Sequence, residues 1–142
     1  MPSAPLTLAA PSVPDPMEAP ASRWGVLAPG GIANTFADAV HEGTRSRVVA
    51  VGSRSLDRAR EFAGRHGVER AHGSYADLVA DPDVDAVYVA SPHSEHHEHA
   101  LLALRAGKPV LVEKAFTRSL LEADEVLETA LASGLLAAEA MW

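Results

Sequence analysis

The sequence predicts an α/β fold in which helices cover both faces of a doubly wound parallel sheet. Short apolar runs alternate along the chain with longer segments whose apolar residues recur at helical spacing, which is the pattern of strands joined by crossover helices. A glycine-rich turn lies directly between the first apolar run and the first helical segment. With 142 residues, of which 47% are hydrophobic, the chain is long enough for one domain with a substantial core.

Strands and helices are expected to alternate from Trp24 onward. The strands are short runs dominated by apolar residues, and they are Trp24–Leu27, Arg47–Val51, Ala86–Ala90, Pro109–Val112 and Leu135–Ala138, with a weaker strand at Arg70–His72. The helices have apolar residues at helical spacing, and they are Ile32–His41, Leu56–His66, Tyr75–Ala80, Glu95–Ala106 and Leu120–Ala132.

Polar residues and glycines mark where several of these helices begin and end. Ser74 precedes the third helix and is a candidate N-cap, because its side-chain oxygen can accept a hydrogen bond from a free backbone N–H. Gly43, Gly67, Gly107 and Gly134 follow helical segments, where glycine readily adopts the left-handed conformation that ends a helix. These signals support the predicted boundaries.

The first 22 residues differ in composition from the rest of the chain. They contain six of the ten prolines and neither lysine nor arginine. Because proline lacks a backbone N–H, residues 1–22 are predicted to form a disordered tail rich in Pro and Ala. The segment lacks the basic start and the unbroken apolar run of a secretory signal, so the cytoplasm is the expected location.

Composition argues against several classes of function. The chain has 12 Lys and Arg residues against 19 Asp and Glu residues, a formal charge of −7, and no basic cluster that would neutralise a nucleic-acid backbone. Its longest apolar run is too short to cross a bilayer. The sequence contains no cysteine, which excludes disulfides, a thiolate nucleophile and Cys-based metal sites. Neither nucleic acid nor a membrane is expected as a partner.

The glycine-rich turn at residues 28–33 has features of a dinucleotide-binding turn. A pyrophosphate needs a backbone that it can approach closely, with free N–H groups and the positive end of a helix dipole. In the G-x-G-x-x-G/A pattern the key positions fall on Ala28, Gly30 and Ala33, so only the first departs from the pattern. The Cβ of Ala28 is tolerable if φ is negative there and damaging if φ is positive, in which case Gly31 could offer compensating freedom. A purely structural turn is the alternative.

The end of the second strand favours one form of the cofactor. In dinucleotide-binding folds an Asp or Glu there binds the ribose 2′-hydroxyl of NAD. This chain instead has Ser53, Arg54 and Ser55. Arg54 can form charge-assisted hydrogen bonds to a 2′-phosphate, and the serines can donate to its oxygens. The residues therefore favour NADP, with NAD as the alternative cofactor; a serine could also cap the next helix, and the two roles are compatible.

Four of the seven histidines lie close together, at His93, His96, His97 and His99. Pairs separated by three or four residues on a helix can bind zinc, but a further well-placed ligand is needed and the His-Glu-x-x-His motif is absent. No metal site is therefore expected. His97 and His99 are expected to be partly exposed helix residues.

Five blocks of sequence together resemble the N-terminal domain of the Gfo/Idh/MocA family, which includes glucose-fructose oxidoreductase and inositol dehydrogenase. They follow the family's order and spacing over residues 23–142, and they are residues 24–33, 52–55, 88–96, 106–114 and 139–142. The subgroup that they resemble most is that of dimeric dihydrodiol dehydrogenase, which favours NADP. The resemblance implies a Rossmann-type cofactor domain followed by an open-faced α+β domain, which supplies much of the site for a sugar, polyol or diol and the interface of a homo-oligomer.

The resemblance also implies roles for particular residues. Lys114 would lie near the nicotinamide and the substrate hydroxyl and assist proton transfer, with Glu113 fixing its orientation. His96 matches the family's histidine at the start of the helix after the fourth strand and is the second candidate catalytic residue. The residues assigned to the cofactor site are Ala28, Gly30, Gly31, Ile32, Ala33, Ser53, Arg54, Ser55, Ser91, Pro92, His93, His96, Glu113 and Lys114.

Three interpretations follow for residues 23–142, which lack a counterpart of the family's C-terminal α+β domain. In the first, they are the cofactor domain of an NADP-dependent oxidoreductase that transfers hydride between the nicotinamide and a secondary alcohol or carbonyl. In the second, they form a module that binds NADP without catalysis. In the third, they are a remnant without function. The first is the interpretation that the sequence favours.

Overall fold

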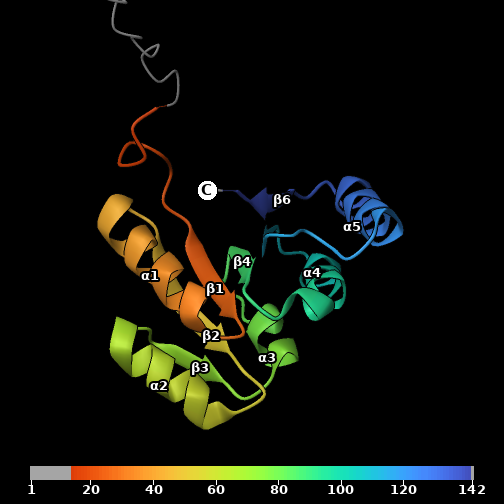
Figure 1. The fold of residues 1–142 in the computed structure, drawn as a ribbon. Coiled ribbons are helices and arrows are strands. Elements are labelled where there is room, and N and C mark those ends of the chain that lie inside the picture. Colours follow the sequence, from red (N-terminus) through yellow and green to blue (C-terminus); the bar gives the residue numbers. More distant parts are fainter. Residues whose placement is uncertain (1–13, 142) are drawn as a thin grey trace, which may run out of the picture.

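A computed structural model describes residues 14–141, and residues 1–13 and 142 lie outside the described part. Six parallel strands form one sheet in the order β3-β2-β1-β4-β5-β6. In chain order the strands are β1 (Arg23–Leu27), β2 (Arg47–Gly52), β3 (Arg70–His72), β4 (Ala86–Val89), β5 (Val110–Glu113) and β6 (Ala137–Ala140). The predicted doubly wound parallel sheet of the Rossmann type is confirmed, including the weak strand at Arg70–His72 (Figure 1).

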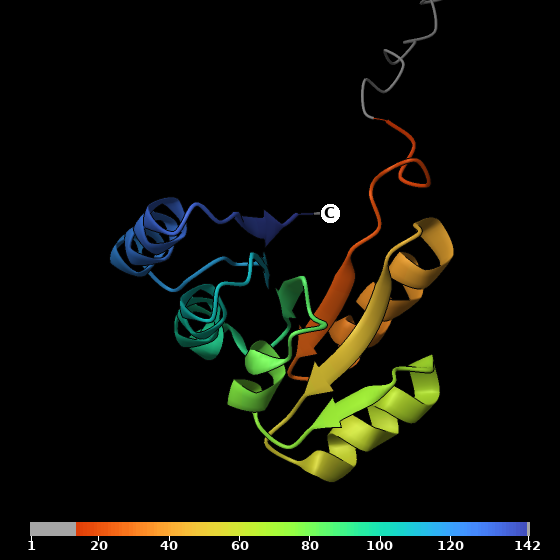
Figure 2. The same ribbon diagram turned by 180° about the vertical axis from the view of Figure 1, so that it is seen from behind.

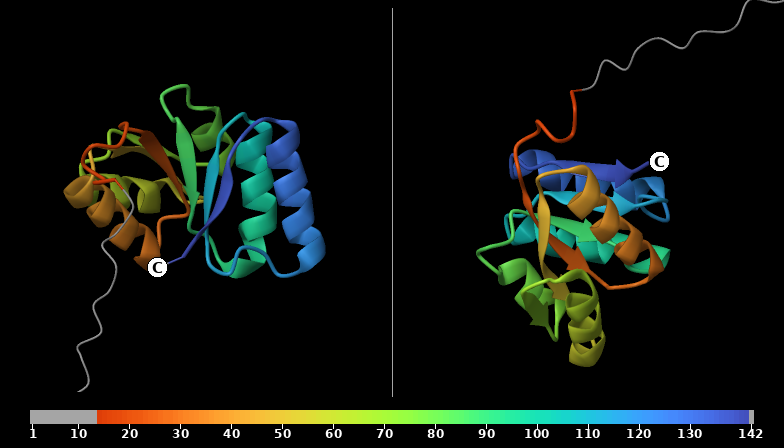
Figure 3. Two further views of the ribbon diagram at one scale, coloured as in Figure 1. Left: turned by 90° about the horizontal axis from the view of Figure 1, so that it is seen from above. Right: turned by 90° about the vertical axis from the view of Figure 1, so that its left-hand side faces the viewer.

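Helices cover both faces of the sheet, as Figures 1 and 2 show from opposite sides. They are α1 (Gly31–Gly43), α2 (Leu56–His66), α3 (Tyr75–Ala80), α4 (His96–Arg105) and α5 (Leu120–Ala132), with a short 3₁₀ helix at His93–Glu95 before α4. In Figure 3, α1 lies on one side of the strands and α4 and α5 lie together on the other. This two-sided cover explains why the strands are apolar runs rather than alternating sequences.

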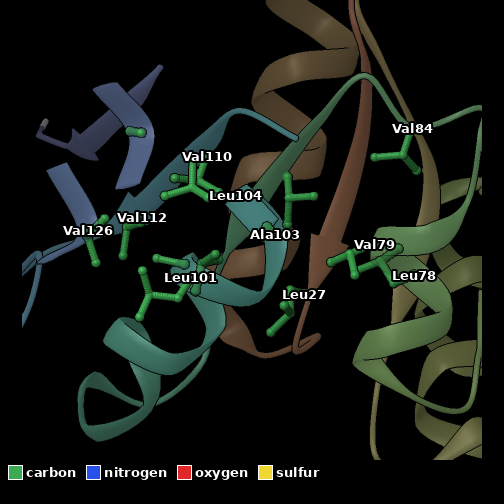
Figure 4. Close-up of a cluster of buried hydrophobic side chains, with 14 of the residues drawn as sticks. Leu27, Leu78, Val79, Val84, Leu101, Ala103, Leu104, Val110, Val112 and Val126 are labelled. Atoms are coloured by element: carbon green, nitrogen blue, oxygen red, sulfur yellow. The ribbon is translucent and has the colours of Figure 1, made fainter. Parts of the chain in front are cut away.

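The core consists of two clusters, one on each face of the sheet. The larger cluster packs residues of α3, α4 and α5, among them Leu78, Leu104 and Val126, against β1, β4 and β5 (Figure 4). The second packs Ala37 of α1 and Phe62 of α2 against the opposite face. Burial of the two faces fixes the register of the strands, since a shift of one residue would turn each strand's apolar side chains to the wrong face.

Capping side chains set the starts of three helices. Ser55, Ser74 and Ser119 each accept a hydrogen bond from a backbone N–H three residues later, at 3.4, 3.0 and 3.3 Å. The predicted N-cap at Ser74 is therefore confirmed. Gly67 ends α2 with φ of 66°, as predicted. Gly43 differs from its prediction, because it is the last residue of α1 and Thr44 is the C-cap.

The last strand begins two residues later than the predicted Leu135–Ala138. The N–H of Leu135 donates to Ala130 O at 2.9 Å, and the N–H of Gly134 donates to Leu131 O at 3.1 Å. These bonds close the end of α5 in the manner of a Schellman motif, so Leu135 still belongs to the helix terminus. The ladder with β5 consequently starts at Ala137, opposite Val110.

Part of the predicted N-terminal tail contacts the folded body. Arg45 Nη2 donates to Ala19 O at 2.8 Å, and the N–H of Ser22 donates to Ser46 Oγ at 3.0 Å. The regular structure begins at Arg23, where the tail was predicted to end. Residues 1–13 of the predicted tail lie outside the described residues.

Candidate functional site

A groove lies at the carboxyl ends of β1, β2 and β4, where the strand order reverses on either side of β1. Such a crevice is the usual ligand site of open parallel sheets. Its volume is about 540 Å³, and its lining residues are Ala28, Pro29, Gly30, Ser53, Arg54, Ser55, Arg58, Tyr75, Ala90, Ser91 and Pro92. Seven residues assigned to the cofactor site by sequence therefore line one groove.

The turn after β1 brings an open stretch of backbone to the groove. Gly30 is the N-cap of α1, and no atom lies within 4 Å of the position that a Cβ would take there. Ala28 has φ of 68°, the left-handed region in which a Cβ is strained. Gly31 does not compensate for this strain, because it is already the first residue of α1. A ligand can therefore approach the backbone closely at Gly30, whereas the backbone conformation at Ala28 is strained.

The end of β2 presents hydroxyl and guanidinium groups to the groove. Ser53 is 6% exposed, and its Oγ accepts the N–H of Ser55 at 3.2 Å. Ser55 in turn caps α2 by accepting the N–H of Arg58. Arg54 and Arg58 are both exposed and line the same groove from the β2–α2 loop and the first turn of α2. Their convergence makes this end of the groove cationic.

The remaining wall of the groove includes residues of α3 and the end of β4. Ser91 is 7% exposed, and its Oγ is buried without a hydrogen-bond partner in the described structure. Tyr75 lines the groove and packs edge-on against His99 at 4.6 Å between ring centroids. His99 is 8% exposed, and burial lowers its pKa, so the prediction that it is a partly exposed residue is wrong. Its ring packs against Tyr75 and helps to hold that side chain in place.

Two histidines of the β4–α4 segment hold the loop that follows β5. His96 is 1% exposed, with its Nδ1 2.8 Å from Ala115 O and its Nε2 3.0 Å from Ser91 O. His93 Nε2 lies 3.0 Å from Thr117 O. Both His96 nitrogens therefore face backbone carbonyls, and these contacts favour a positioning role over the direct catalytic role predicted for this residue.

The side chain of Lys114 is exposed on this held loop. Its peptide bond to Ala115 is cis. The N–H of Lys114 donates to Glu113 Oε2 at 3.2 Å, and the N–H of Phe116 donates to Glu139 Oε1 at 2.7 Å. The backbone around Lys114 is thus fixed from both sides, which leaves its ammonium group to reach toward a ligand.

Seven residues assigned to the cofactor site do not line the groove: His93, His96 and Lys114, described above, and Gly31, Ile32, Ala33 and Glu113. Glu113 and Ile32 line a separate, largely apolar cavity of about 440 Å³ beside α1, and Glu113 binds Tyr88 there. Gly31 lines a smaller cavity between α1 and α2. Ala33 is fully buried in the core, where a small side chain lets α1 approach the sheet. Glu113 therefore supports Lys114 through the backbone and does not itself face the groove.

The groove fits a dinucleotide. The unpartnered Ser91 Oγ needs a hydrogen-bond partner, and the open side of Gly30 leaves room for a phosphate at the start of α1. Arg54 and Arg58 supply positive charge at one end, and Tyr75 supplies an aromatic surface beside them.

Comparison with known proteins places the chain in a family. Residues 22–140 match the Gfo/Idh/MocA model, described as an oxidoreductase family with an NAD-binding Rossmann fold. The chain belongs to the Gfo/Idh/MocA family. It is 46% identical over 132 residues to the NADP(+) D-xylose 1-dehydrogenase of Hypocrea jecorina, and 41% identical over 124 residues to the trans-1,2-dihydrobenzene-1,2-diol dehydrogenase of Bos taurus.

The alignments cover most of this chain but a minor part of each Gfo/Idh/MocA relative. They include 84% and 86% of this chain against 34% and 37% of the two enzymes, so the chain spans about a third of their length. Among solved structures, it resembles the 3-ketoreductase KijD10 of Actinomadura kijaniata in complex with TDP-benzene and NADP. That similarity has a TM-score of 0.79 at 39% identity and covers 83% of this chain and 37% of the other.

Four groove residues were not assigned from the sequence, namely Pro29, Arg58, Tyr75 and Ala90, and of these Arg58 and Tyr75 bear polar or aromatic side chains. Arg54 lies in the loop before α2 and Arg58 lies in the first turn of α2, and both line the groove. A second arginine shortly after the second strand was the signal that could have identified Arg58. Tyr75 had no such signal, because its position in the groove depends on how α3 packs.

The four clustered histidines face different partners. His97 Nε2 lies 2.8 Å from Glu125 Oε2, whereas His93 and His96 face carbonyl oxygens and His99 packs on Tyr75. Over residues 14–141 the structure contains no group of three or more His, Asp or Glu side chains that could hold a metal ion. In the same range no helix is long and apolar enough to span a membrane.

Proposed function

We propose that this chain binds NADP in the groove and forms the cofactor domain of a dehydrogenase that acts on a CH–OH group. The observation that carries the proposal is the charge at the end of β2. Ser53, Arg54, Ser55 and Arg58 line the groove there, and no acidic residue is among the described residues that line it. A 2′-phosphate can accept hydrogen bonds from both guanidinium groups, whereas the ribose of NAD offers only hydroxyls to them.

The rest of the groove suits the remainder of the cofactor. The pyrophosphate would lie against the open backbone at Gly30, near the positive end of α1. The Oγ of Ser91 would donate its proton to the bound dinucleotide, which removes the cost of leaving a buried hydroxyl unpaired. The adenine would pack on Tyr75 beside the two arginines.

Lys114 is the residue that we assign to the reaction. A bound nicotinamide would accept or supply the hydride, while Lys114 would hold or release the proton of the substrate hydroxyl at its Nζ. His96, His93 and Glu113 keep the loop that carries Lys114 in place through their hydrogen bonds to Ala115 O, Thr117 O and the N–H of Lys114. A sugar, polyol or diol is the proposed substrate, in keeping with the names of the relatives, and a homo-oligomer is the proposed state of a full-length enzyme.

Calorimetric titration of the chain with NADP⁺ and NAD⁺ under matched conditions tests the cofactor assignment. We expect tighter binding of NADP⁺, and Arg54→Ala should weaken it by on the order of 1.5–3 kcal/mol while leaving NAD⁺ affinity unchanged. Arg60→Ala is the matched control, because Arg60 is exposed on α2 and does not line the groove. Equal binding of both cofactors, or an unchanged NADP⁺ affinity in Arg54→Ala, would contradict the proposal.

A second experiment separates the enzyme from a binding module. The chain, and a longer protein containing it, are assayed for NADP⁺ reduction with xylose and with a cyclic diol. Turnover that disappears in Lys114→Met while NADP⁺ affinity is retained supports the assignment of Lys114. NADP⁺ binding without turnover in either protein would favour a module that binds the cofactor without catalysis.

A further inference from the structure

The start of α1 is tied to the end of α2 by hydrogen bonds to one side chain, that of Asn34. His66 Nε2 lies 2.7 Å from Asn34 Oδ1, and Arg65 Nη1 donates to the same oxygen at 3.2 Å. The His66 side chain is only 5% exposed. Water therefore competes little with the hydrogen bond between His66 and Asn34, and this bond is stronger than the same bond on an open surface.

Asn34 extends this contact to the turn that borders the groove. Its Nδ2 donates to Gly30 O at 2.8 Å, and the same oxygen accepts the backbone N–H of Asn34 at 3.2 Å. Gly30 lines both the groove and an adjoining cavity of about 220 Å³ between α1 and α2. The network thus holds a residue of the groove wall through its carbonyl oxygen.

His66 and Arg65 also fix which way the amide of Asn34 faces. The Arg65 guanidinium can only donate, so the amide atom that it contacts is Oδ1 and the NH₂ group points toward Gly30 O. His66 donates to the same oxygen in the tautomer that carries its proton on Nε2. The His66 ring is held in turn by packing against Phe62, at 4.5 Å between ring centroids. Its Nδ1 lies 3.2 Å from Asp38 Oδ1, and a ring that donates from Nε2 to Asn34 donates there too only when both nitrogens carry a proton. If the amide turned over, two acceptor oxygens would face each other at Gly30, which is unfavourable.

We propose that His66 and Asn34 are positioning residues for the pyrophosphate of the cofactor, acting through the carbonyl of Gly30. This inference rests on the proposed NADP-binding function. Both ends of α2 would then serve the cofactor site: Arg58 in its first turn lines the groove where the 2′-phosphate would lie, and His66 at its end holds Asn34. Neither His66 nor Asn34 lines the groove itself, and Asn34 lines the adjoining cavity, which shares Gly30 with the groove.

The test compares two ligands that share the 2′-phosphate and differ in the pyrophosphate. NADP⁺ contains both groups, whereas adenosine 2′-monophosphate lacks the pyrophosphate. We expect His66→Ala and Asn34→Ala each to raise the Kd of NADP⁺ by about tenfold, the effect of losing one well-formed hydrogen bond. The Kd of adenosine 2′-monophosphate should stay within about twofold of the wild-type value. Arg60→Ala should change neither.

The double variant His66→Ala/Asn34→Ala provides the second readout. If His66 acts through Asn34, the double variant binds NADP⁺ no more weakly than Asn34→Ala alone. Additive losses, equal losses for both ligands, or no loss for NADP⁺ would overturn the proposal. If His66→Ala does not fold, Asn34→Ala decides by itself, since alanine is a good helix former at that position of α1. A wild-type chain that bound neither ligand would instead overturn the proposed function, and this inference with it.

Discussion

The phenol of Tyr88 in β4 donates a hydrogen bond of 2.6 Å to Glu113 Oε1 in β5. Both side chains are buried, with 1% and 6% of their surfaces exposed, and Tyr88 stacks on Phe36 of α1 at 3.9 Å. Burial raises the pKa of Tyr88, and its hydrogen bond to Glu113 raises it further, so the phenol remains a donor. The other oxygen of Glu113 is thereby placed to accept the N–H of Lys114.

Removing this phenol should destabilise the fold. Tyr88→Phe keeps the stacked ring but leaves one oxygen of a buried carboxylate without its donor, which should cost about 2 kcal/mol in the free energy of unfolding. Urea unfolding measures the loss. The control is the same Tyr88→Phe change made in a Glu113→Gln background, where no buried charge remains to be left unpaired and the contact with the N–H of Lys114 is altered equally in both proteins. If Tyr88→Phe lost the same free energy in both backgrounds, the unpaired charge would not be the cause.

Replacing Ala28 by glycine should stabilise the chain. Ala28 has φ of 68°, which costs an alanine about 1 kcal/mol relative to glycine. Ala28→Gly should therefore raise the urea midpoint, despite the greater freedom of glycine in the unfolded chain. Ala39→Gly is the matched control at an exposed position of α1, where the same change should destabilise by about 1 kcal/mol. Destabilisation by both variants would show that the turn is not strained.

Ala28 illustrates where prediction from sequence stopped. The pattern of apolar runs, the glycine-rich turn and the Ser-Arg-Ser segment predicted the parallel sheet and five residues of the groove, because each of these is a local signal. Ser91 and Pro92 were implied by the resemblance to the family. The N–H of Ala28 donates to Gly52 O, so Ala28 is still hydrogen-bonded to β2 while the chain turns from β1 into α1. The geometry of that turn decides whether φ is positive at Ala28. No local signal carries that information.

The same limit explains the residues that were misplaced. Glu113 and Lys114 are adjacent in sequence, but Glu113 ends a strand and its side chain enters the face covered by α1, whereas Lys114 begins the loop. His99 was expected to be a partly exposed residue of its helix. Its burial depends on the position of α3, which carries Tyr75. Contacts between distant elements decided each of these cases.

Arg58 should contribute to the preference for NADP⁺ through its charge. Arg58→Ala should weaken NADP⁺ binding about tenfold and leave NAD⁺ binding unchanged, because only NADP⁺ carries the 2′-phosphate. The NADP⁺ affinity of the variant should also depend less on salt, because salt screens the attraction between the exposed Arg58 and the phosphate and the variant lacks that attraction. Titrations at low and high salt measure both effects. An unaltered salt dependence would mean that Arg58 does not face the phosphate.

Asp81 should make stability depend on pH at the acidic end. Its carboxylate follows α3 with its side chain 4% exposed, 2.9 Å from Arg70 Nε and 3.0 Å from His72 Nε2. Burial alone would raise the pKa of Asp81, but hydrogen bonds from the N–H of Asp83 and from His72, with the charge of Arg70, leave it below its ordinary value.

Because the pKa of Asp81 is lower in the folded state, its carboxylate adds its full contribution to the free energy of unfolding at pH values above its unfolded pKa of about 4. That contribution is lost as the pH falls through the folded pKa. Asp81→Asn should therefore reduce the free energy of unfolding by about 2 kcal/mol at neutral pH, since Arg70 and His72 lose their charged partner. Urea titrations from neutral pH to about pH 3 should show the gap between wild type and variant closing as the carboxylate is protonated. Arg60→Ala, whose guanidinium lies on the exposed side of α2, should follow the wild-type pH profile. A gap that stayed constant down to the acid limit would assign the loss to packing rather than to the charge of Asp81.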